Sequence, residues 1–194
     1  MKNEDIVARS FSESISAKQA FMTPENLSLV VKSAELIVDS FKKGGKLLIA
    51  GNGGSAADAQ HLAAEFVNRF EIERPPLPAI ALTTDSSNLT SIGNDYSFDL
   101  IFSKQLRALG KPDDVFLAIT TSGNSRNILK ALEEAESIGM KVIILTGKGG
   151  GLLSSKGDVL VNVEARKTAR IQEVHITFCH VVCELVDSIL FQKA

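Results

Sequence analysis

Residues 46–55 read KLLIAGNGGS, and this stretch decides the fold. A run of mostly apolar residues, which suits a buried strand, leads at once into a glycine-rich turn and then an alanine-rich helical segment at 55–69. Glycines let the backbone turn tightly and approach a ligand closely. A buried strand that passes through such a turn into a helix is typical of parallel α/β sheets.

The same unit recurs along the rest of the chain, which carries four more apolar runs and further helical segments. The runs are 79–82, 115–119, 142–145 and 159–163, and the helical segments include 98–109 and 125–138. The middle runs are continuously apolar, as strands covered on both faces are. The alternation predicts a five-stranded parallel sheet in a three-layer αβα sandwich. Ligands of such folds bind beyond the carboxyl ends of the strands, so we look for function just after each run.

Helices are expected at both ends of this core. Residues 3–20 form a polar amphipathic pattern, and Thr23-Pro24 signals the start of a second helix, since Thr suits the cap and Pro the first turn. Gly44-Gly45 ends that helix. Residues 168–192 form a long amphipathic helical pattern.

The chain length favours a single domain. With 194 residues, we expect one domain over 1–194, made of a helical arm at 1–44 and an α/β core with the long last helix at 45–194. Apolar residues make up 44% of the chain and charged residues 23%, which is ordinary for a soluble globular protein.

The charge and cysteine content exclude several classes of function. The formal net charge is −2, so no broad basic surface for nucleic acid is expected, and an anion would have to be held by a local device. Two cysteines, Cys179 and Cys183, are too few for a secreted disulfide framework. The N-terminus does not look like a signal peptide, and no uninterrupted apolar run reaches the ~20 residues of a membrane span. We therefore expect a cytoplasmic protein that does not associate with membranes.

Two loops predict a site for a phosphate group. The first is 51–55, where free N–H groups at a helix start favour an anion, although a plain strand–helix turn would look the same. Its spacing matches neither a Walker loop nor a dinucleotide fingerprint. The second is 120–125, which places four hydroxyls and a glycine before a helix. A helix cap would need only one hydroxyl, so the second loop favours a phosphomonoester.

Two further loops carry weaker signals. Residues 83–87 and Gly93-Asn94-Asp95 offer side chains that could bind sugar hydroxyls, but turn closure accounts for them equally well and is the preferred interpretation. The glycine-rich segment 147–151 is expected to be a flexible loop without chemistry.

Four side chains from two helical segments form a possible acid–base and metal site. His61 and Glu65 are four residues apart and share a helix face, while Gln172 and His180 are eight apart in the last helix. Their mixed nitrogen and oxygen donors suit a divalent ion. A structural histidine and a solvated glutamate are the alternative explanation for the first pair. His175, in the same last helix, could be a ligand or base, but a structural role explains it more simply.

These motifs resemble the SIS (sugar isomerase) domain family. The resemblance rests on residues 51–61 and 121–125, and it covers nearly the whole chain. Glu65, residues 93–95 and residues 170–175 are similar to the branch of the family that isomerises sedoheptulose 7-phosphate. The resemblance implies a flavodoxin-like SIS fold and a homotetramer with active sites at subunit interfaces.

The resemblance also implies an activity. Such an enzyme converts sedoheptulose 7-phosphate to D-glycero-D-manno-heptose 7-phosphate through an enediolate, the first step towards nucleotide-activated heptose for lipopolysaccharide or capsule. Glu65 and His180 are the candidate acid–base pair, in either order of action. One zinc per subunit is implied, on His61, Glu65, Gln172 and His180. The candidate substrate contacts are Asn52, Gly53, Gly54, Ser55, Glu65, Asn94, Asp95, Thr120, Thr121, Ser122, Ser125 and Gln172.

A second relative in the family offers a non-enzymatic alternative. A tetrameric bacterial protein that binds the replication initiator has the same fold, and residues 68–82 and 123–126 look like that protein. That relative has lost the catalytic carboxylate and the last-helix histidine, whereas this chain has Glu65 and His180. The chemistry of these two positions favours the enzyme.

Overall fold

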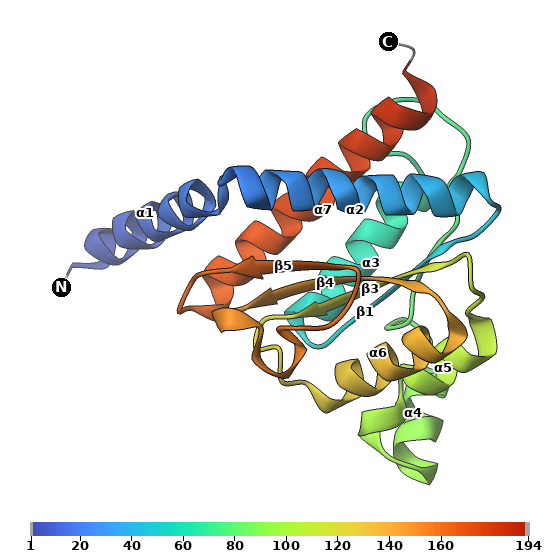
Figure 1. Cartoon of the computed structure of the whole chain (residues 1–194). Helices are drawn as coiled ribbons and strands as arrows, with labels where there is room; N and C mark the ends of the chain where they lie inside the picture. Colours follow the sequence, from blue (N-terminus) through green and yellow to red (C-terminus); the bar gives the residue numbers. More distant parts are fainter. Residues whose placement is uncertain (1, 193–194) are drawn as a thin grey trace.

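The centre of the molecule is a five-stranded, all-parallel sheet, which we describe from a computed structural model over residues 2–192 (Figure 1). The strand order is β2-β1-β3-β4-β5. The strands are β1 (Leu47–Gly51), β2 (Ala79–Ala81), β3 (Val115–Thr120), β4 (Lys141–Gly147) and β5 (Val159–Val163). Because β1 pairs with both β2 and β3, the strand order reverses beside it, which is where such folds bind ligands.

Helices cover both faces of the sheet, so the predicted three-layer αβα sandwich is confirmed (Figure 1). One layer holds α2 (Pro24–Lys42), α3 (Gly54–Val67) and α7 (Thr168–Phe191). The other holds α4 (Ser86–Asp95), α5 (Ser103–Leu109) and α6 (Arg126–Ile138). The 3-10 turns are η1 (Phe98–Leu100), between α4 and α5, and η2 (Lys148–Leu153), between β4 and β5. Alternation along β1 feeds both cores, since Leu47 and Ile49 pack under the first layer and Leu48 and Ala50 under the second.

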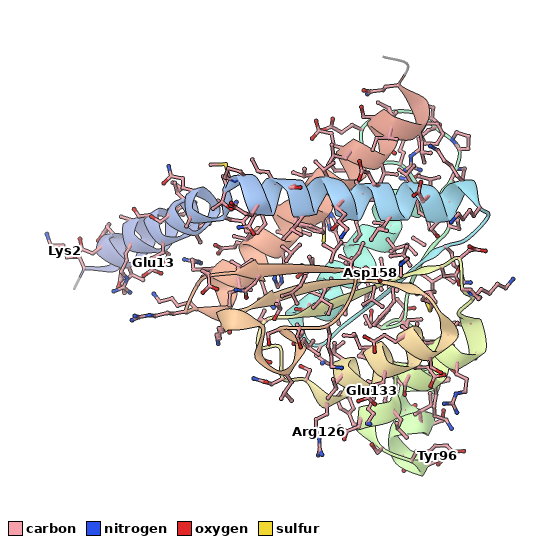
Figure 2. All side chains as sticks on the ribbon, viewed as in Figure 1. Lys2, Glu13, Tyr96, Arg126, Glu133 and Asp158 are labelled. Atoms are coloured by element: carbon pink, nitrogen blue, oxygen red, sulfur yellow. The ribbon has the colours of Figure 1, made fainter. Side chains whose placement is uncertain are left out.

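The first helix of the N-terminal arm is exposed, unlike the elements of the core. Helix α1 (Asn3–Phe21) projects from the body and has no buried residue (Figure 1). Figure 2 shows Glu13 on this helix, and its carboxylate lies 2.6 Å from the Lys167 ammonium at the start of α7. Helix α2 begins as predicted, with the Thr23 hydroxyl accepting a hydrogen bond from the Asn26 N–H at 3.2 Å.

Helix α7 is long and apolar enough to cross a membrane by length and mean hydropathy, although charged residues interrupt its apolar sequence. It packs against α2 and α3, however, and Cys179, Val182 and Cys183 are fully buried in the core. A helix that other elements cover is apolar on its covered sides, so burial in the core explains the composition of α7.

Three local predictions need correction. The turn interpretation holds for residues 83–85 but is wrong for 86–87 and 93–95, because residues 86–95 form α4, capped by the Asp85 carboxylate on the Asn88 N–H at 3.0 Å. The helix expected at 98–109 is broken into η1 and α5. The loop expected to be flexible at 147–151 is packed, since a Cβ on Gly123 would overlap the Gly150 carbonyl oxygen.

Candidate active site

A pocket of about 260 Å³ lies at the carboxyl ends of β1 and β3, where the two predicted phosphate loops meet. Its lining residues are Asn52, Gly54, Ser55, Ile119, Thr120, Thr121, Ser122, Ser125, Thr168 and Gln172. Gln172 reaches across from α7, and its side-chain amide lies so close to Gly54 that a Cβ there would require the amide to move. The structure therefore brings eight of the predicted substrate contacts together.

Three helices begin at this pocket without a side-chain cap on the N-cap residue. In the described chain, the N-cap residues of α3, α6 and α7 (Gly53, Ser125 and Lys167) make no capping hydrogen bond through a side chain. By contrast, Thr23 and Asp85 cap α2 and α4 away from the pocket. The positive ends of three helix dipoles favour an anion, and most strongly a doubly charged one.

The hydroxyls of the second loop do not cap α6. The Ser125 hydroxyl lies 3.2 Å from the Thr120 hydroxyl instead of capping α6. The Ser122 hydroxyl accepts a hydrogen bond from the Asn124 N–H at 3.2 Å. The arrangement suits the oxygens of a phosphomonoester, each of which accepts several hydrogen bonds.

Asn127 is a site residue that the sequence analysis missed. It is buried, and its side-chain amide pairs reciprocally with that of Asn52, with N–O distances of 2.9 Å and 2.8 Å. This pair fixes the orientation of Asn52 in the pocket wall. A lone Asn one residue into a helix carries no signal that distinguishes it from a capping or surface residue.

Four predicted substrate contacts do not line the pocket: Gly53 is the N-cap of α3, Glu65 lies further along α3, and Asn94 and Asp95 lie on α4. Asn94 and Asp95 are in the last turn of α4, exposed, with the Asn94 amide donating to the Asp95 carboxylate at 2.9 Å. Neither lines the pocket. Their assignment as substrate contacts stays a prediction.

The predicted acid–base pair lies further along the same two helices. His61 Nε2 is 3.1 Å from His180 Nε2 and 3.1 Å from Glu65 Oε1. The His61 side chain is 48% exposed and that of Glu65 is 25% exposed, so the cluster is open to a ligand. We call these three residues the histidine–glutamate cluster. His61 lies between the two candidate acid–base groups and can donate its proton to only one of them at a time.

Two residues that support this cluster were also missed. The ring of Phe70 stacks on His180, with centroids 5.7 Å apart and an interplanar angle of 26°. Arg74 holds the loop that carries Phe70, because its Nε contacts the buried Asp187 carboxylate at 2.7 Å and its NH2 donates to the Glu65 carbonyl at 2.9 Å. Arg74 thereby ties the end of α3 to α7. Nothing in the local sequence marks either residue for this role.

The donor atoms of the cluster match zinc in type, but the site is not preformed. Zinc takes histidine nitrogen and carboxylate oxygen, and tetrahedral bonds of about 2.0–2.1 Å would separate two donors by roughly 3.3 Å. The observed separations of 3.1 Å are close to that spacing. Over residues 2–192, however, no group of three or more His, Cys, Asp and Glu side chains is arranged to hold a metal ion. The fourth predicted ligand, Gln172, lies against Gly54 in the phosphate pocket.

Two other titratable groups on these helices are closed off. His175 is fully buried, with Nε2 3.0 Å from the Thr146 carbonyl oxygen, and burial lowers its pKa to about 4. The structural interpretation of His175 fits this placement. Asp58 lies one turn before His61, and burial raises the pKa of its carboxyl group.

The sequence and the fold were compared with known proteins. The SIS domain model matches residues 10–147. A phosphoheptose isomerase from Thermodesulfovibrio yellowstonii is 52% identical over 192 residues, covering 99% of this chain and 95% of that protein. One from Shewanella oneidensis is 54% identical over 189 residues, covering 95% of this chain and 94% of that protein.

Solved structures give the same result. The phosphoheptose isomerase of Neisseria gonorrhoeae superposes with a TM-score of 0.91 at 48% identity, covering 96% of this chain and all of that one. That of Francisella tularensis superposes with a TM-score of 0.91 at 44% identity, covering 97% and 100%. Of the two alternatives raised by the sequence, these relatives support the enzyme. The chain belongs to the SIS domain family and, within it, to the phosphoheptose isomerases.

Proposed function

We propose that this protein interconverts sedoheptulose 7-phosphate and D-glycero-D-manno-heptose 7-phosphate. The observation that carries the proposal is the pairing, on α3 and α7, of a neutral phosphate pocket with a cluster of acid–base groups. The names of the relatives point to the same substrate class.

The pocket would hold the phosphate and so fix the position of the sugar chain. Its donors would be the hydroxyls of Thr120, Thr121, Ser122 and Ser125 and backbone N–H groups at the starts of three helices. Their contribution is orientation, which places the reacting carbons instead of changing bonds.

Glu65 and His180 would carry out the proton transfers. In the open-chain ketose, Glu65 removes a proton from carbon 1, giving an enediolate, and returns it to carbon 2. His180 gives a proton to the oxygen on carbon 2 and takes the proton of the hydroxyl on carbon 1, which becomes the aldehyde. His61, in contact with both groups, would hold their relative orientation. No proton is gained or lost over the cycle.

A divalent ion, which we expect to be zinc at one per subunit, would be held by His61, Glu65 and His180 after small side-chain rotations. When bound, zinc would polarise the carbonyl and stabilise the enediolate. Gln172 would join these ligands only by leaving its place beside Gly54.

Metal content checks this part of the proposal. Elemental analysis after gentle purification should find close to one equivalent of zinc, and His61→Ala should lose it. Gln172→Ala should retain the metal if Gln172 serves the phosphate pocket instead. A metal-free protein whose stability and turnover do not respond to added zinc would leave the cluster as acid–base groups only.

We also propose a homotetramer in the cytoplasm. Helix α1 projects from the body and exposes the apolar side chains Ile6, Val7, Phe11 and Ile15. An apolar face of this kind is usually covered by another subunit. Both cysteines are buried free thiols, in keeping with a reducing compartment. Sedimentation should give the mass of four chains at micromolar concentration, and Phe11→Glu should dissociate them. A monomeric parent protein would contradict the proposal.

The activity is tested by incubating purified protein with sedoheptulose 7-phosphate and following the aldose 7-phosphate by NMR. Formation of the aldose, with exchange of solvent deuterium at carbon 2, is the expected result. A protein without turnover that binds the bacterial replication initiator would overturn the proposal in favour of the non-enzymatic alternative.

A further inference from the structure

The phosphate pocket holds no charged side chain among its described lining residues. A phosphomonoester carries about −1.5 to −2 charge at pH 7, and the whole chain has a formal net charge of −2. Neutral hydrogen-bond donors and helix termini act at close range, since the dipole effect falls off within the first turn. Fixed cations near the pocket but outside it would add a long-range attraction for the substrate.

Lys148 lies at such a position and in an unusual conformation. It directly follows β4, and among residues 2–192 it is the one non-glycine residue with positive φ, at 55°. Its neighbours Gly147, Gly149, Gly150 and Gly151 show that glycine suits this turn. Glycine would adopt this positive φ without strain, whereas a lysine adopts it at a cost. A lysine at this position therefore indicates that its side chain has a function.

The loop that carries Lys148 touches both walls of the pocket. On one side, a Cβ on Gly123 would overlap the Gly150 carbonyl oxygen, and the Leu152 N–H donates to the Asn124 side chain at 3.2 Å. On the other side, Gly147 packs against Ile171 in the first turn of α7. The loop is thus wedged between the 120–125 segment and the N-terminus of α7, and Lys148 is its first residue after β4.

Arg166 completes a cationic rim with Lys148. The two line an open hollow of about 520 Å³ together with Glu164 and Ala165, and Arg166 precedes Thr168 of the pocket by two residues. In the described part of the chain neither cation forms an ion pair, whereas nearby Lys167 is bound to Glu13. Glu164 is the one acid in the lining, and its carboxylate accepts a hydrogen bond from Asn162. One positive charge is left in excess.

We propose that Lys148 and Arg166 form a capture site for the phosphate group of the substrate, which draws the anion to the rim and passes it to the neutral pocket. The inference rests on the proposed isomerase function and adds to it two residues that determine affinity for anionic sugars. Lys148 and Arg166 act when the substrate first approaches the protein and take no part in the proton transfers. They are therefore positioning residues and not catalytic ones.

The test is the salt dependence of kcat/KM for matched variants at Lys148. Lys148→Gly removes the charge and suits the positive φ, while Lys148→Arg keeps the charge. At about 0.01 M salt, where the Debye length is about 30 Å, Lys148→Gly should lower kcat/KM about tenfold with kcat unchanged. At about 1 M salt, where the Debye length is about 3 Å, it should match the parent.

Three controls define the outcome. Lys148→Arg should behave as the parent, and Arg166→Gln should repeat the loss seen in Lys148→Gly. Lys130→Gln, which removes an exposed cation on α6 paired with Glu133, should change nothing. A loss in Lys148→Gly that is equal at all salt concentrations, or that appears in kcat, would overturn the capture role, as would an unchanged kcat/KM.

Binding of inorganic phosphate separates this inference from the proposed function. Calorimetry at low salt should show weaker phosphate binding for Lys148→Gly than for the parent, whether or not the parent isomerises the sugar. Absent turnover with intact phosphate binding would refute the isomerase alone. Equal phosphate affinity in parent and Lys148→Gly at low salt would refute the capture site alone.

Discussion

The two ends of the α3–α7 pair offer opposite means of holding ligand groups. Near the helix N-termini, the proposed phosphate pocket is neutral and built from backbone N–H groups and hydroxyls. About 12 Å further along α7, eight residues at 1.5 Å each, the histidine–glutamate cluster consists of imidazole and carboxylate groups. The difference teaches that fixed dipoles suffice to bind a charge, whereas proton transfer needs side chains that accept and donate protons.

The separation of roles predicts different kinetic consequences for each end. A change in the cluster should lower kcat, because it removes a group that acts in the transition state. A change in the pocket should raise KM, because phosphate binding is shared by the ground state and the transition state. The predictions below follow this division, from the largest effect on activity to the smallest.

The largest effect is expected for Glu65→Gln in the cluster. The fold and most sugar-phosphate affinity should remain, and turnover should fall by ~10²–10⁴-fold, the usual contribution of a positioned acid–base group. Steady-state kinetics with sedoheptulose 7-phosphate measure this split. Glu184→Gln, the same chemical change at an exposed position of α7, is the control and should be neutral. Retained turnover in Glu65→Gln would move the carbon-bound proton to another residue.

A smaller effect is expected for Ser122→Ala in the pocket, and it should appear in KM instead of kcat. One lost hydrogen bond to a charged group costs about 1.5–3 kcal/mol, which corresponds to roughly 10- to 150-fold in binding. KM should rise by that factor with kcat nearly unchanged. Ser155→Ala, at an exposed position outside the pocket, serves as the matched control. If kcat falls instead and KM stays constant, the two ends are not separate in function.

The smallest effect on activity is expected for His175→Gln, since this residue lies on α7 but touches neither end. The free energy of unfolding should respond instead. The folded-state pKa of His175 is lowered to about 4 from 6.5, so its contribution is fully present above pH 6.5 and is lost as the pH falls towards 4. Relative to His175→Gln, the parent should lose up to about 3 kcal/mol over that window.

Urea unfolding of both proteins at several pH values measures this difference. Parallel pH profiles would show that His175 is not the titrating group. A turnover defect at neutral pH would show that the buried histidine contributes to the site after all.

The fold could be predicted from the sequence because its signal is local and repeated. Four of the five apolar runs are followed by a turn rich in glycine or hydroxyl residues, such as 47–51 with Gly53, and the five strands appear within two residues of their predicted bounds. Helix α4 was missed because Asp85, Asn94 and Asp95 are common turn residues, and only the hydrogen bond of Asp85 to Asn88 distinguishes a cap from a turn.

The site could be predicted in part for a related reason. The pocket residues follow strands directly, so the topology alone brings them together. His61 and His180 are 119 residues apart, and their contact depends on how α3 packs on α7, which helical spacing does not reveal. Phe70 and Arg74 lie in an irregular loop, where no periodicity reports which side chain turns inward.

The contact between α3 and α7 also has a consequence for synthesis. At about 5–20 residues per second, His180 is translated roughly 6–24 s after His61, given the 119 residues between them. Throughout that interval the apolar face of α3, with Leu62 and Phe66, lacks the helix that covers it. The nascent chain therefore lacks one of the three helices of this layer until its last long helix leaves the ribosome, and that is the period in which chaperones would bind the exposed apolar surface.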